Sequence, residues 1–233
     1  MIARCAIPVA LAFSMCGCMI ETVGPTQHDS RTVELDKSEL VRVELKMGAG
    51  NLRVDSGTQK LMRADFTYNV PSSKPYVRYA ASPVHANLTI EQPSTREARL
   101  GHSKYEWDVR LNRDVPLDMN VHFGAGHAVL NLGHLNLHGV EVDMGVGKLE
   151  LDLRGSPKRN YSVRVQGGVG EAIIRLPSST GVEAEAEGGI GSIQAPGFQQ
   201  DGHTYRNDSY EHAKVRIHLE IHGGVGSIRL LSE

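Results

Sequence analysis

Alternation of apolar and polar residues, the period of a half-buried β-strand, dominates this 233-residue chain. In six similar segments the alternation runs up to a Gly-x-Gly triplet and resumes after it. The four central copies begin 21, 23 and 21 residues apart, and the last begins 35 residues after the fourth of these. Repetition at such a period is typical of a solenoid. The six copies are residues 43–54, 119–130, 140–151, 163–174, 184–195 and 219–230.

Aligned on their glycines, the copies show columns of one chemical kind. The first two apolar columns are Val43, Met119, Val140, Val163, Ala184 and Leu219, and then Leu45, Val121, Val142, Val165, Ala186 and Ile221. After the glycines the apolar columns are Leu52, Ala128, Leu149, Ala172, Ile193 and Ile228, and then Val54, Leu130, Leu151, Ile174, Ala195 and Leu230. Side chains alternate along a strand, so these columns are predicted to face inward. Each copy is therefore predicted to be one β-arc that buries its apolar face only against another copy.

The glycines are expected to mark the points where each copy changes direction. Glycine accepts positive φ at little steric cost, and its missing Cβ allows neighbouring copies to approach closely. A phosphate-binding role is not favoured, because neither G-x-G-x-x-G before a helix nor a P-loop occurs. The predicted structural turn glycines are Gly48, Gly50, Gly124, Gly126, Gly145, Gly147, Gly168, Gly170, Gly189, Gly191, Gly224 and Gly226.

The predicted fold class is all-β, a parallel β-solenoid-like stack of G-x-G rungs with an antiparallel insertion near its N-terminal end. One domain is expected over 33–233, with the insertion or cap at 58–118 and the repeat rungs at 119–233. The insertion holds the single tryptophan, Trp107, and is interpreted as a hydrophobic plug over the first rung, with a binding platform as the alternative. The polar loop 197–214 is either functional or merely tolerated.

The N-terminal residues 1–18 are predicted to be an export signal of lipoprotein type. Arg4 is followed by a short apolar run, and Met15-Cys16-Gly17-Cys18 is similar to a lipobox in which Cys18 would be acylated. An ordinary cleaved signal is the alternative. All three cysteines lie in these 18 residues, so the fold is expected to need no disulfide. Residues 19–32 are interpreted as a tether between lipid and domain.

Charge and composition argue against several kinds of partner. A formal net charge of -2 lacks the basic excess of a nucleic-acid binder. Eleven histidines, notably His122, His127, His134 and His138, invite a metal site, but no H-E-x-x-H motif or cysteine partner accompanies them. Scattered surface histidines are the preferred interpretation. No metal and no cofactor are predicted.

Catalysis has few candidates in the sequence. The outward column contains His122, Asp143, Gln166, Glu187 and His222. If the stack followed chain order, Asp143 and Glu187 would lie two rungs apart, within the range of about 5 to 10 Å used by paired carboxylates in glycosidases. Alternating charges on a solvated sheet face explain the same residues, and no G-x-S-x-G elbow is present. No catalytic residues are predicted.

From Trp107 through Pro116, the glycine pairs 124/126 and 145/147, and the link LNLGHLNLHGVEV, the sequence resembles the toastrack family of bacterial envelope proteins (DUF2154/DUF4097-like). The resemblance extends over about 33–233 and also includes adhesin-type domains built from the same rungs. It implies a parallel β-stack and an envelope location, and it supplies no catalytic residues. Some relatives act in responses to cell-wall antibiotics and carry membrane helices before this domain, which this chain lacks.

The expected function is a non-catalytic, envelope-anchored lipoprotein that acts as a binding, scaffold or stress-response module. The expected partners are the membrane, through the N-terminal lipid, and an envelope protein or glycan. In a cell with two membranes the expected location is the outer membrane or the periplasm. Self-association is a further hypothesis, because the chain ends on SIRLLSE, which would leave an open C-terminal edge strand. A carbohydrate-active β-helix, either a lyase or a hydrolase, is the alternative.

Overall fold

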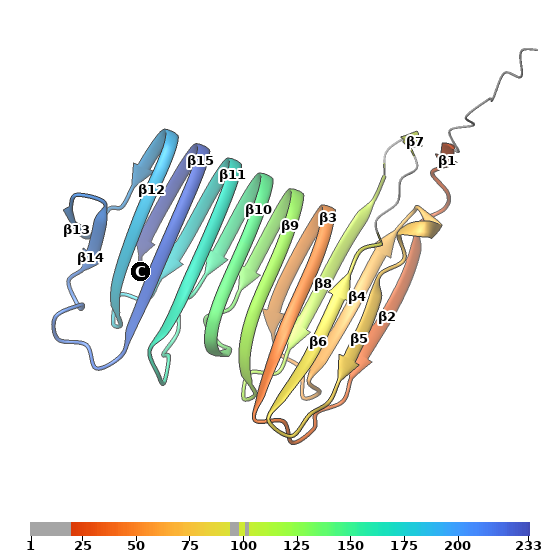
Figure 1. The fold of residues 1–233 in the computed structure, drawn as a ribbon, viewed down its shortest axis with the longest axis horizontal. Helices are drawn as coiled ribbons and strands as arrows, with labels where there is room; N and C mark the ends of the chain where they lie inside the picture. Colours follow the sequence, from red (N-terminus) through yellow and green to blue (C-terminus); the bar gives the residue numbers. More distant parts are fainter. Residues whose placement is uncertain (1–19, 94–97, 101–102) are drawn as a thin grey trace, which may run out of the picture.

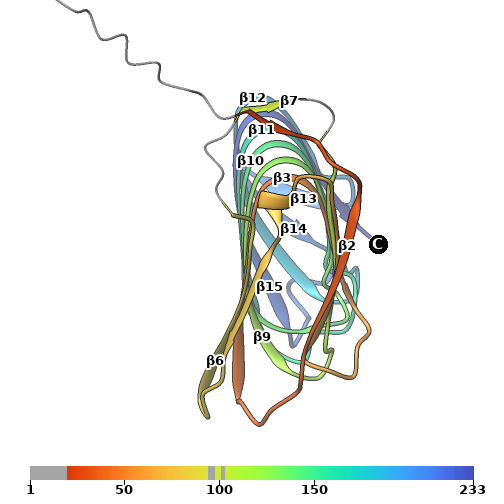
Figure 2. The ribbon, with the colours of Figure 1, turned by 90° about the vertical axis from the view of Figure 1, so that its right-hand side faces the viewer.

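The computed structural model describes residues 20–93, 98–100 and 103–233. The predicted signal at 1–18 and its lipid-attachment residue, Cys18, lie outside the described residues. The fold is all-β and is dominated by one large, mostly parallel sheet, so the predicted fold class is confirmed. Figures 1 and 2 show the strands side by side in a row that is longer than it is thick.

Fifteen strands and one short 3-10 helix, Pro71–Ser73, make up the described part of the chain. The strands are β1 Ile20–Thr22, β2 Gln27–Val33, β3 Leu40–Ser56, β4 Met62–Tyr68, β5 Tyr76–Ala80, β6 His85–Glu91, β7 Ala98–Leu100, β8 Tyr105–Leu111, β9 Pro116–Asn131, β10 Asn136–Asp152, β11 Tyr161–Leu176, β12 Gly181–Gln194, β13 Phe198–Asp201, β14 Thr204–Asn207 and β15 Arg216–Ser232.

Six long strands, which we call rungs, carry the six repeated segments: β3, β9, β10, β11, β15 and β12 in spatial order. Each rung rises through one wall of the molecule, bends at its Gly-x-Gly, and descends through the other wall, as the end-on view in Figure 2 shows. Neighbouring rungs pair in parallel on both sides of the bend. Two packed walls thus arise from one set of bent strands.

The inward columns predicted from the sequence coincide with the core. Val121 pairs with Val142 and Val142 with Val165, so the column stays in register from rung to rung. All members of the two columns before the glycines are buried, with at most 4% of their surface exposed. In the columns after the glycines, only Ala172, Ile193 and Ala195 are partly exposed. The prediction that the copies share one interior is therefore confirmed.

The order of the rungs differs from the order of the chain. The last copy, in β15, lies between β11 and β12 and pairs in parallel with both. The prediction of an open C-terminal edge strand is therefore wrong, because both edges of β15 are occupied. The strand β12 is the outermost rung instead.

At the other end of the stack, two shorter strands complete the rung pattern. The first half of β3 pairs with β6, and its second half pairs with β8. In the next layer β4 is antiparallel to β8, and β5 is antiparallel to β6. Trp107 of β8 is 2% exposed and meets Phe66 of β4 edge-on, with 5.6 Å between ring centroids. These strands, which we call the cap, cover the side of β3 that faces away from the other rungs.

Part of the predicted tether belongs to the domain. The strand β2 pairs along its whole length with β4 and forms the outer edge of its wall, and β1 pairs with β7. A tether over 19–32 is therefore wrong for the described residues 20–22 and 27–32. The alternating pattern of β2 is weak because as an edge strand it buries little, which explains why polarity suggested a linker.

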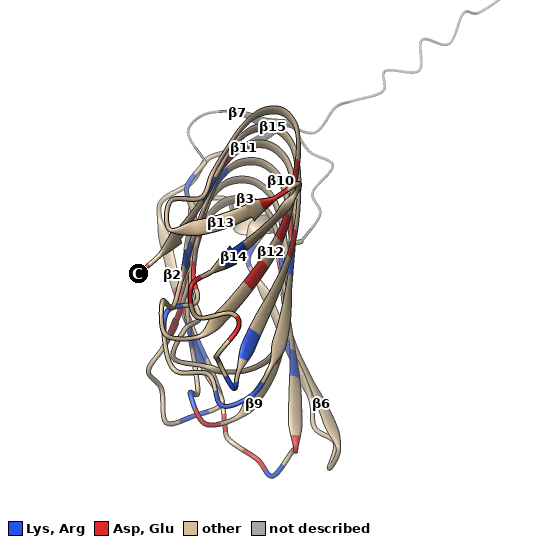
Figure 3. Ribbon diagram, turned by 90° about the vertical axis from the view of Figure 1, so that its left-hand side faces the viewer, with Lys and Arg blue, Asp and Glu red and all other residues tan. Residues whose placement is uncertain are grey.

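The loop 197–214 forms a hairpin, β13–β14, across the open end at β12, as Figure 3 shows. Asn207 is 4% exposed, and its side chain accepts a hydrogen bond from the Val182 amide (2.9 Å) and donates one to the Thr180 carbonyl (2.8 Å). Arg206 forms an ion pair with Glu183 of β12 at 2.6 Å. Tyr205 is buried against the core. The hairpin is thus fastened to the last rung as a cap.

Candidate functional site

The bends bring the backbones of successive rungs into close contact. The second glycine of every copy has positive φ: Gly50, Gly126, Gly147, Gly170, Gly191 and Gly226. At Gly126, φ is 126° and a Cβ would lie 2.1 Å from the carbonyl oxygen of Gly50 on the preceding rung. At the first glycine, for example Gly145, a Cβ would lie 2.3 Å from the Gly124 oxygen. Turn geometry and stacking distance both require glycine here.

A glutamine side chain covers the bend of β3, the first rung, on the side where no further rung follows. Gln92 Oε1 accepts hydrogen bonds from the amides of Gly48 (2.7 Å) and Ala49 (3.2 Å). These amides would otherwise lack a protein acceptor on this side of the bend. The repeat pattern gave no indication of this contact, because Gln92 lies outside the repeats.

A row of exposed apolar side chains, which we call the crest, runs along the bends. Each rung contributes the middle residue of its Gly-x-Gly: Ala49, Ala125, Val146, Val169, Val225 and Ile190 in spatial order. Exposure reaches 53% at Val146, 47% at Val169, 46% at Val225 and 74% at Ile190. Adjacent members follow at the strand spacing of about 4.8 Å. Single exposed apolar side chains are common on protein surfaces, but a contiguous exposed apolar row of this kind is typical of an interaction surface.

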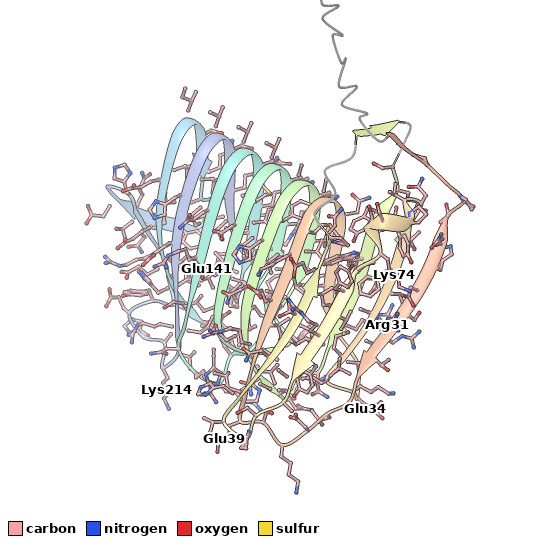
Figure 4. The ribbon with its side chains drawn as sticks, turned by 45° about the vertical axis from the view of Figure 1, so that its right-hand side comes forward. Arg31, Glu34, Glu39, Lys74, Glu141 and Lys214 are labelled. Atoms are coloured by element: carbon pink, nitrogen blue, oxygen red, sulfur yellow. The ribbon has the colours of Figure 1, made fainter. Side chains whose placement is uncertain are left out.

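Charged side chains lie away from the crest. The ribbon of the bends is uncharged in Figure 3, and in Figure 4 Glu34, Glu39 and Lys214 lie near the opposite edge of the molecule. The flanks next to the bends carry both signs, for instance Lys148, which pairs with Glu150 at 3.0 Å. The hydrogen bond from Lys148 lowers the pKa of Glu150. The crest is therefore apolar between flanks of mixed charge.

The proposed carboxylate pair of the enzymatic alternative is not brought together. Because β15 is inserted, Asp143 of β10 and Glu187 of β12 are three strand spacings apart, about 14 Å. This exceeds the range of about 5 to 10 Å that two glycosidase carboxylates need. Asp143 pairs instead with His122 at 2.9 Å, and Glu187 lies 3.8 Å from His222. The spacing expected from chain order was wrong for these two residues.

The candidate histidines are dispersed over the surface. His127 contacts Glu150 at 3.2 Å, and His138 contacts Arg159 at 2.6 Å. Burial and the nearby Arg159 charge lower the pKa of His138. Among the described residues no cluster of three or more His, Cys, Asp or Glu could hold a metal ion.

In the described ranges, no helix is long and apolar enough to span a membrane. The profile of the N-terminal domain of toast_rack, DUF2154, matches residues 22–175, which run from the end of β1 to the end of β11. No curated protein sequence matches the chain.

Solved structures resemble the chain to very different degrees. A candidate cell adhesion protein from Clostridium sporogenes is 33% identical, with coverage of 90% of this chain and 100% of that one, and a TM-score of 0.87. A candidate adhesin from Bacteroides fragilis is 10% identical over 89% of this chain and 97% of its own, with a TM-score of 0.31. A candidate lipid binding protein from Parabacteroides distasonis is 12% identical over 90% and 98%, also with a TM-score of 0.31. The last two similarities are too weak to carry an argument. The profile match and the first structure show that the chain belongs to the toast_rack N-terminal domain family, DUF2154.

Proposed function

We propose that the protein is a non-catalytic lipoprotein of the bacterial envelope that is anchored through acylated Cys18 and serves as a binding scaffold. In this arrangement the crest rests against the membrane. The two walls and the edge opposite the bends stay free for an envelope protein or a glycan. The similarity to a candidate cell adhesion protein supports a binding role of this kind.

One observation carries the proposal: the chain enters the domain on the same side as the crest. The strand β1 lies beyond the end of the row of bends, on their side of the molecule, in Figure 1. Cys18 precedes Ile20, the first residue of β1, by two positions, a reach of about 7 Å at most. A lipid on Cys18 would therefore hold the bends near the bilayer surface.

The crest contributes a second, weaker attachment. Burial of four half-exposed Val and Ile side chains is worth roughly 1 kcal/mol each, or about 4 kcal/mol together. Alone this corresponds to a dissociation constant of about 1 mM. The crest alone therefore binds the membrane too weakly for stable attachment and needs the lipid anchor, and the crest in turn fixes the orientation of the anchored domain. Because the flanks carry both signs, we expect the contact to depend little on salt.

Attachment is tested by metabolic labelling of the full chain with an alkyne-modified fatty acid. We expect incorporation in the wild type and none in Cys18→Ser, whose product should be released from the membrane. Labelling that persists in Cys18→Ser would contradict the assigned attachment residue.

Orientation is tested with an environment-sensitive fluorophore. All three native cysteines lie in the first 18 residues, so Val169→Cys supplies a labelling site in the domain. We expect a blue-shifted emission for a label at Val169 in membranes. The matched control is Val84→Cys, at a residue that is similarly exposed (52%) but lies in the turn between β5 and β6. Equal emission from the two sites would refute the membrane-facing crest.

A further inference from the structure

The space between the walls just beneath the crest is filled at one end of the stack and hollow at the other. The residue directly before each Gly-x-Gly points into this space, and it is large in three rungs and glycine in the other three. These residues are Met47, Phe123 and Met144 in β3, β9 and β10, and Gly167, Gly223 and Gly188 in β11, β15 and β12. The three large side chains are buried, whereas the three glycines border a cavity of about 380 Å³.

The backbone does not require these three glycines. None of them has positive φ. A Cβ at Gly167 would have the His222 carbonyl oxygen as its nearest neighbour, at 4.0 Å, and at Gly188 the nearest atom would be 3.8 Å away. Only Gly223 is tight, at 3.0 Å from the terminal Cδ1 of Ile228, which is the flexible end of a side chain. The hollow therefore exists because these three positions lack side chains, and the backbone geometry of the bend does not require it.

The cavity has an apolar interior and a polar rim. Its inward-facing apolar lining residues are Met144, Ala172, Ile193, Ile228 and Tyr205, and the crest residues Val169, Val225 and Ile190 border it as well. Met144 is buried on β10, whereas Gly188 is exposed on the outermost rung, so the mouth lies at the β12 end. Gln200 and His203 of the β13–β14 hairpin border the cavity beside β12 and supply polar groups there.

The dimensions and chemistry of the cavity select its occupant. The two walls pack about 10 Å apart, and Met144 lies three strand spacings from β12, roughly 14 Å. The volume falls within the range of about 300 to 1,000 Å³ that is usual for small-ligand sites. A sugar would need polar side chains distributed along the walls. The polar residues on the lining strands, Glu171, Ser192 and Ser227, directly precede the inward-facing Ala172, Ile193 and Ile228, so their side chains alternate to the outer face. A long, thin apolar ligand with one polar end fits all three properties.

We infer that this cavity binds a single fatty-acyl chain, with its polar end at the rim beside Gln200 and His203. The inference deepens the proposed function, because a crest lying on the bilayer would hold the site close to a source of such chains. Binding itself requires neither the anchor nor the crest contact. The free fatty acid and the acyl chain of a phospholipid are two sources of the same ligand.

The experiment is photo-crosslinking on isolated membranes that contain the full-length protein. One arm uses diazirine-modified dodecanoic acid, and the other uses a lysophosphatidylcholine with the same diazirine in its acyl chain. Trypsin releases peptides 165–175 and 176–206, which hold Ala172 and Ile193, and fragmentation assigns the modified residue. We expect adducts at the inward-facing Ala172 or Ile193, and we expect excess unlabelled dodecanoic acid to remove at least nine-tenths of them.

Filling the hollow is the decisive perturbation. Gly167→Met places in β11 the side chain that Met144 has in β10, and it should lower the cavity adducts at least tenfold while leaving the thermal midpoint of unfolding unchanged or raised. The control, Val84→Met, adds the same side chain to an exposed loop and should change the amount of cavity adducts less than twofold. Met144→Ala, which deepens the cavity, should shift the preference from dodecanoic towards hexadecanoic acid.

The outcomes separate this inference from the proposed function. Adducts only at Val146, a crest residue that does not line the cavity, would mark the crest and overturn the cavity assignment. The cavity assignment would also be overturned if cavity adducts persisted in Gly167→Met, or if neither probe formed adducts in the cavity. Cavity adducts in an unanchored Cys18→Ser chain would support it even if the assigned anchor were wrong. Adducts with only one probe would support the site and identify the source of the chain.

Discussion

Replacement of a bend glycine by alanine separates backbone strain from the close approach of rungs. Gly57 and Gly126 have the same φ of 126°, but a Cβ at Gly57 would meet nothing within 4 Å. In Gly57→Ala only the conformational cost remains, about 1 to 3 kcal/mol. The reduced freedom of the unfolded chain returns roughly 0.4 to 1 kcal/mol of this. We therefore expect Gly57→Ala to lose about 1 to 2 kcal/mol of unfolding free energy.

Gly126→Ala carries the same strain and a collision in addition. Its Cβ would lie 2.1 Å from the Gly50 carbonyl oxygen, more than 1 Å closer than an ordinary contact. Backbone atoms on both sides must move apart, which costs about 1 to 3 kcal/mol of overpacking strain. Two ladder hydrogen bonds at the bend would weaken, at about 0.5 to 1.5 kcal/mol each. Together with the loss of about 1 to 2 kcal/mol expected for Gly57→Ala, these terms give an expected loss of about 3 to 8 kcal/mol.

Equilibrium unfolding in urea measures these differences. Trp107 is the single tryptophan, is 2% exposed, and lies on β8 beside β3, so its fluorescence reports loss of the core. Gly188→Ala serves as a third variant, because that glycine has ordinary φ and room for a methyl group, and its free energy should stay within about 0.5 kcal/mol of wild type. A Gly126→Ala protein as stable as Gly57→Ala would refute the stacking explanation of the bend glycines.

Three further predictions concern the two ends of the stack. Gln92→Ala removes the acceptor of two amides at an exposed bend and should cost about 1 kcal/mol, seen as a lower urea midpoint. Asn207→Ala leaves the Val182 amide and the Thr180 carbonyl without their buried partner and should cost about 2 to 3 kcal/mol, with faster hydrogen exchange in β13 and β14. Burial raises the pKa of Glu183, but the hydrogen bond from Arg206 and its charge outweigh burial and lower it overall. This pair therefore stabilises the folded state above the unfolded pKa of about 4.3, and the contribution is lost as pH falls through the lower folded pKa. Glu183→Gln should be up to about 1 kcal/mol less stable than wild type at pH 7 by thermal unfolding, and this difference should shrink as pH falls below about 4.3; a difference that stays constant as pH falls would contradict the assignment.

Much of the fold follows from the sequence because burial imposes a period of two. In β10, Val140 and Val142 are buried and Glu141 between them is partly exposed. Each Gly-x-Gly fixes the register, since a slip by one residue would place the apolar columns on the outside. The paired columns of Val121, Val142 and Val165 confirm this reasoning. The cap around Trp107 could also be predicted, because an end rung exposes its apolar face until something covers it.

The order of the rungs could not be read in the same way. The six copies have equivalent shapes, so each can stack on any other, and chain order decides only when connections are short. The longer interval before residue 219 indicated an extra segment but gave no indication of where the last copy would dock. The separation of Asp143 and Glu187 was wrong for this reason alone. The tether was wrong at 27–32 because the edge strand β2 has little apolar surface to show a period.

The candidate sites were missed for different reasons. The crest is a single column of Ala, Val and Ile, and its significance depends on the bends, which turn those side chains outward. The cavity had a signal in the printed sequence, namely Met144 in one copy and Gly167 at the same position in the next. That column does not stand out in the sequence, because a third glycine directly before Gly-x-Gly has the same residue type as the turn glycines. Gln92 had no signal, because its partners are backbone amides.

The placement of β15 has a consequence for how the molecule is made. The chain emerges from the ribosome with its N-terminus first, so the rungs from β3 to β11 can stack as they appear. The strand β12 pairs with no earlier rung, and only the β13–β14 hairpin can pair with it until the final seventeen-residue strand arrives to join it to β11. Until then the free edge of β11 offers unpaired backbone groups to any neighbouring nascent chain. Assembly therefore ends with the C-terminus, and a premature stop before β15 would detach two rungs and not one.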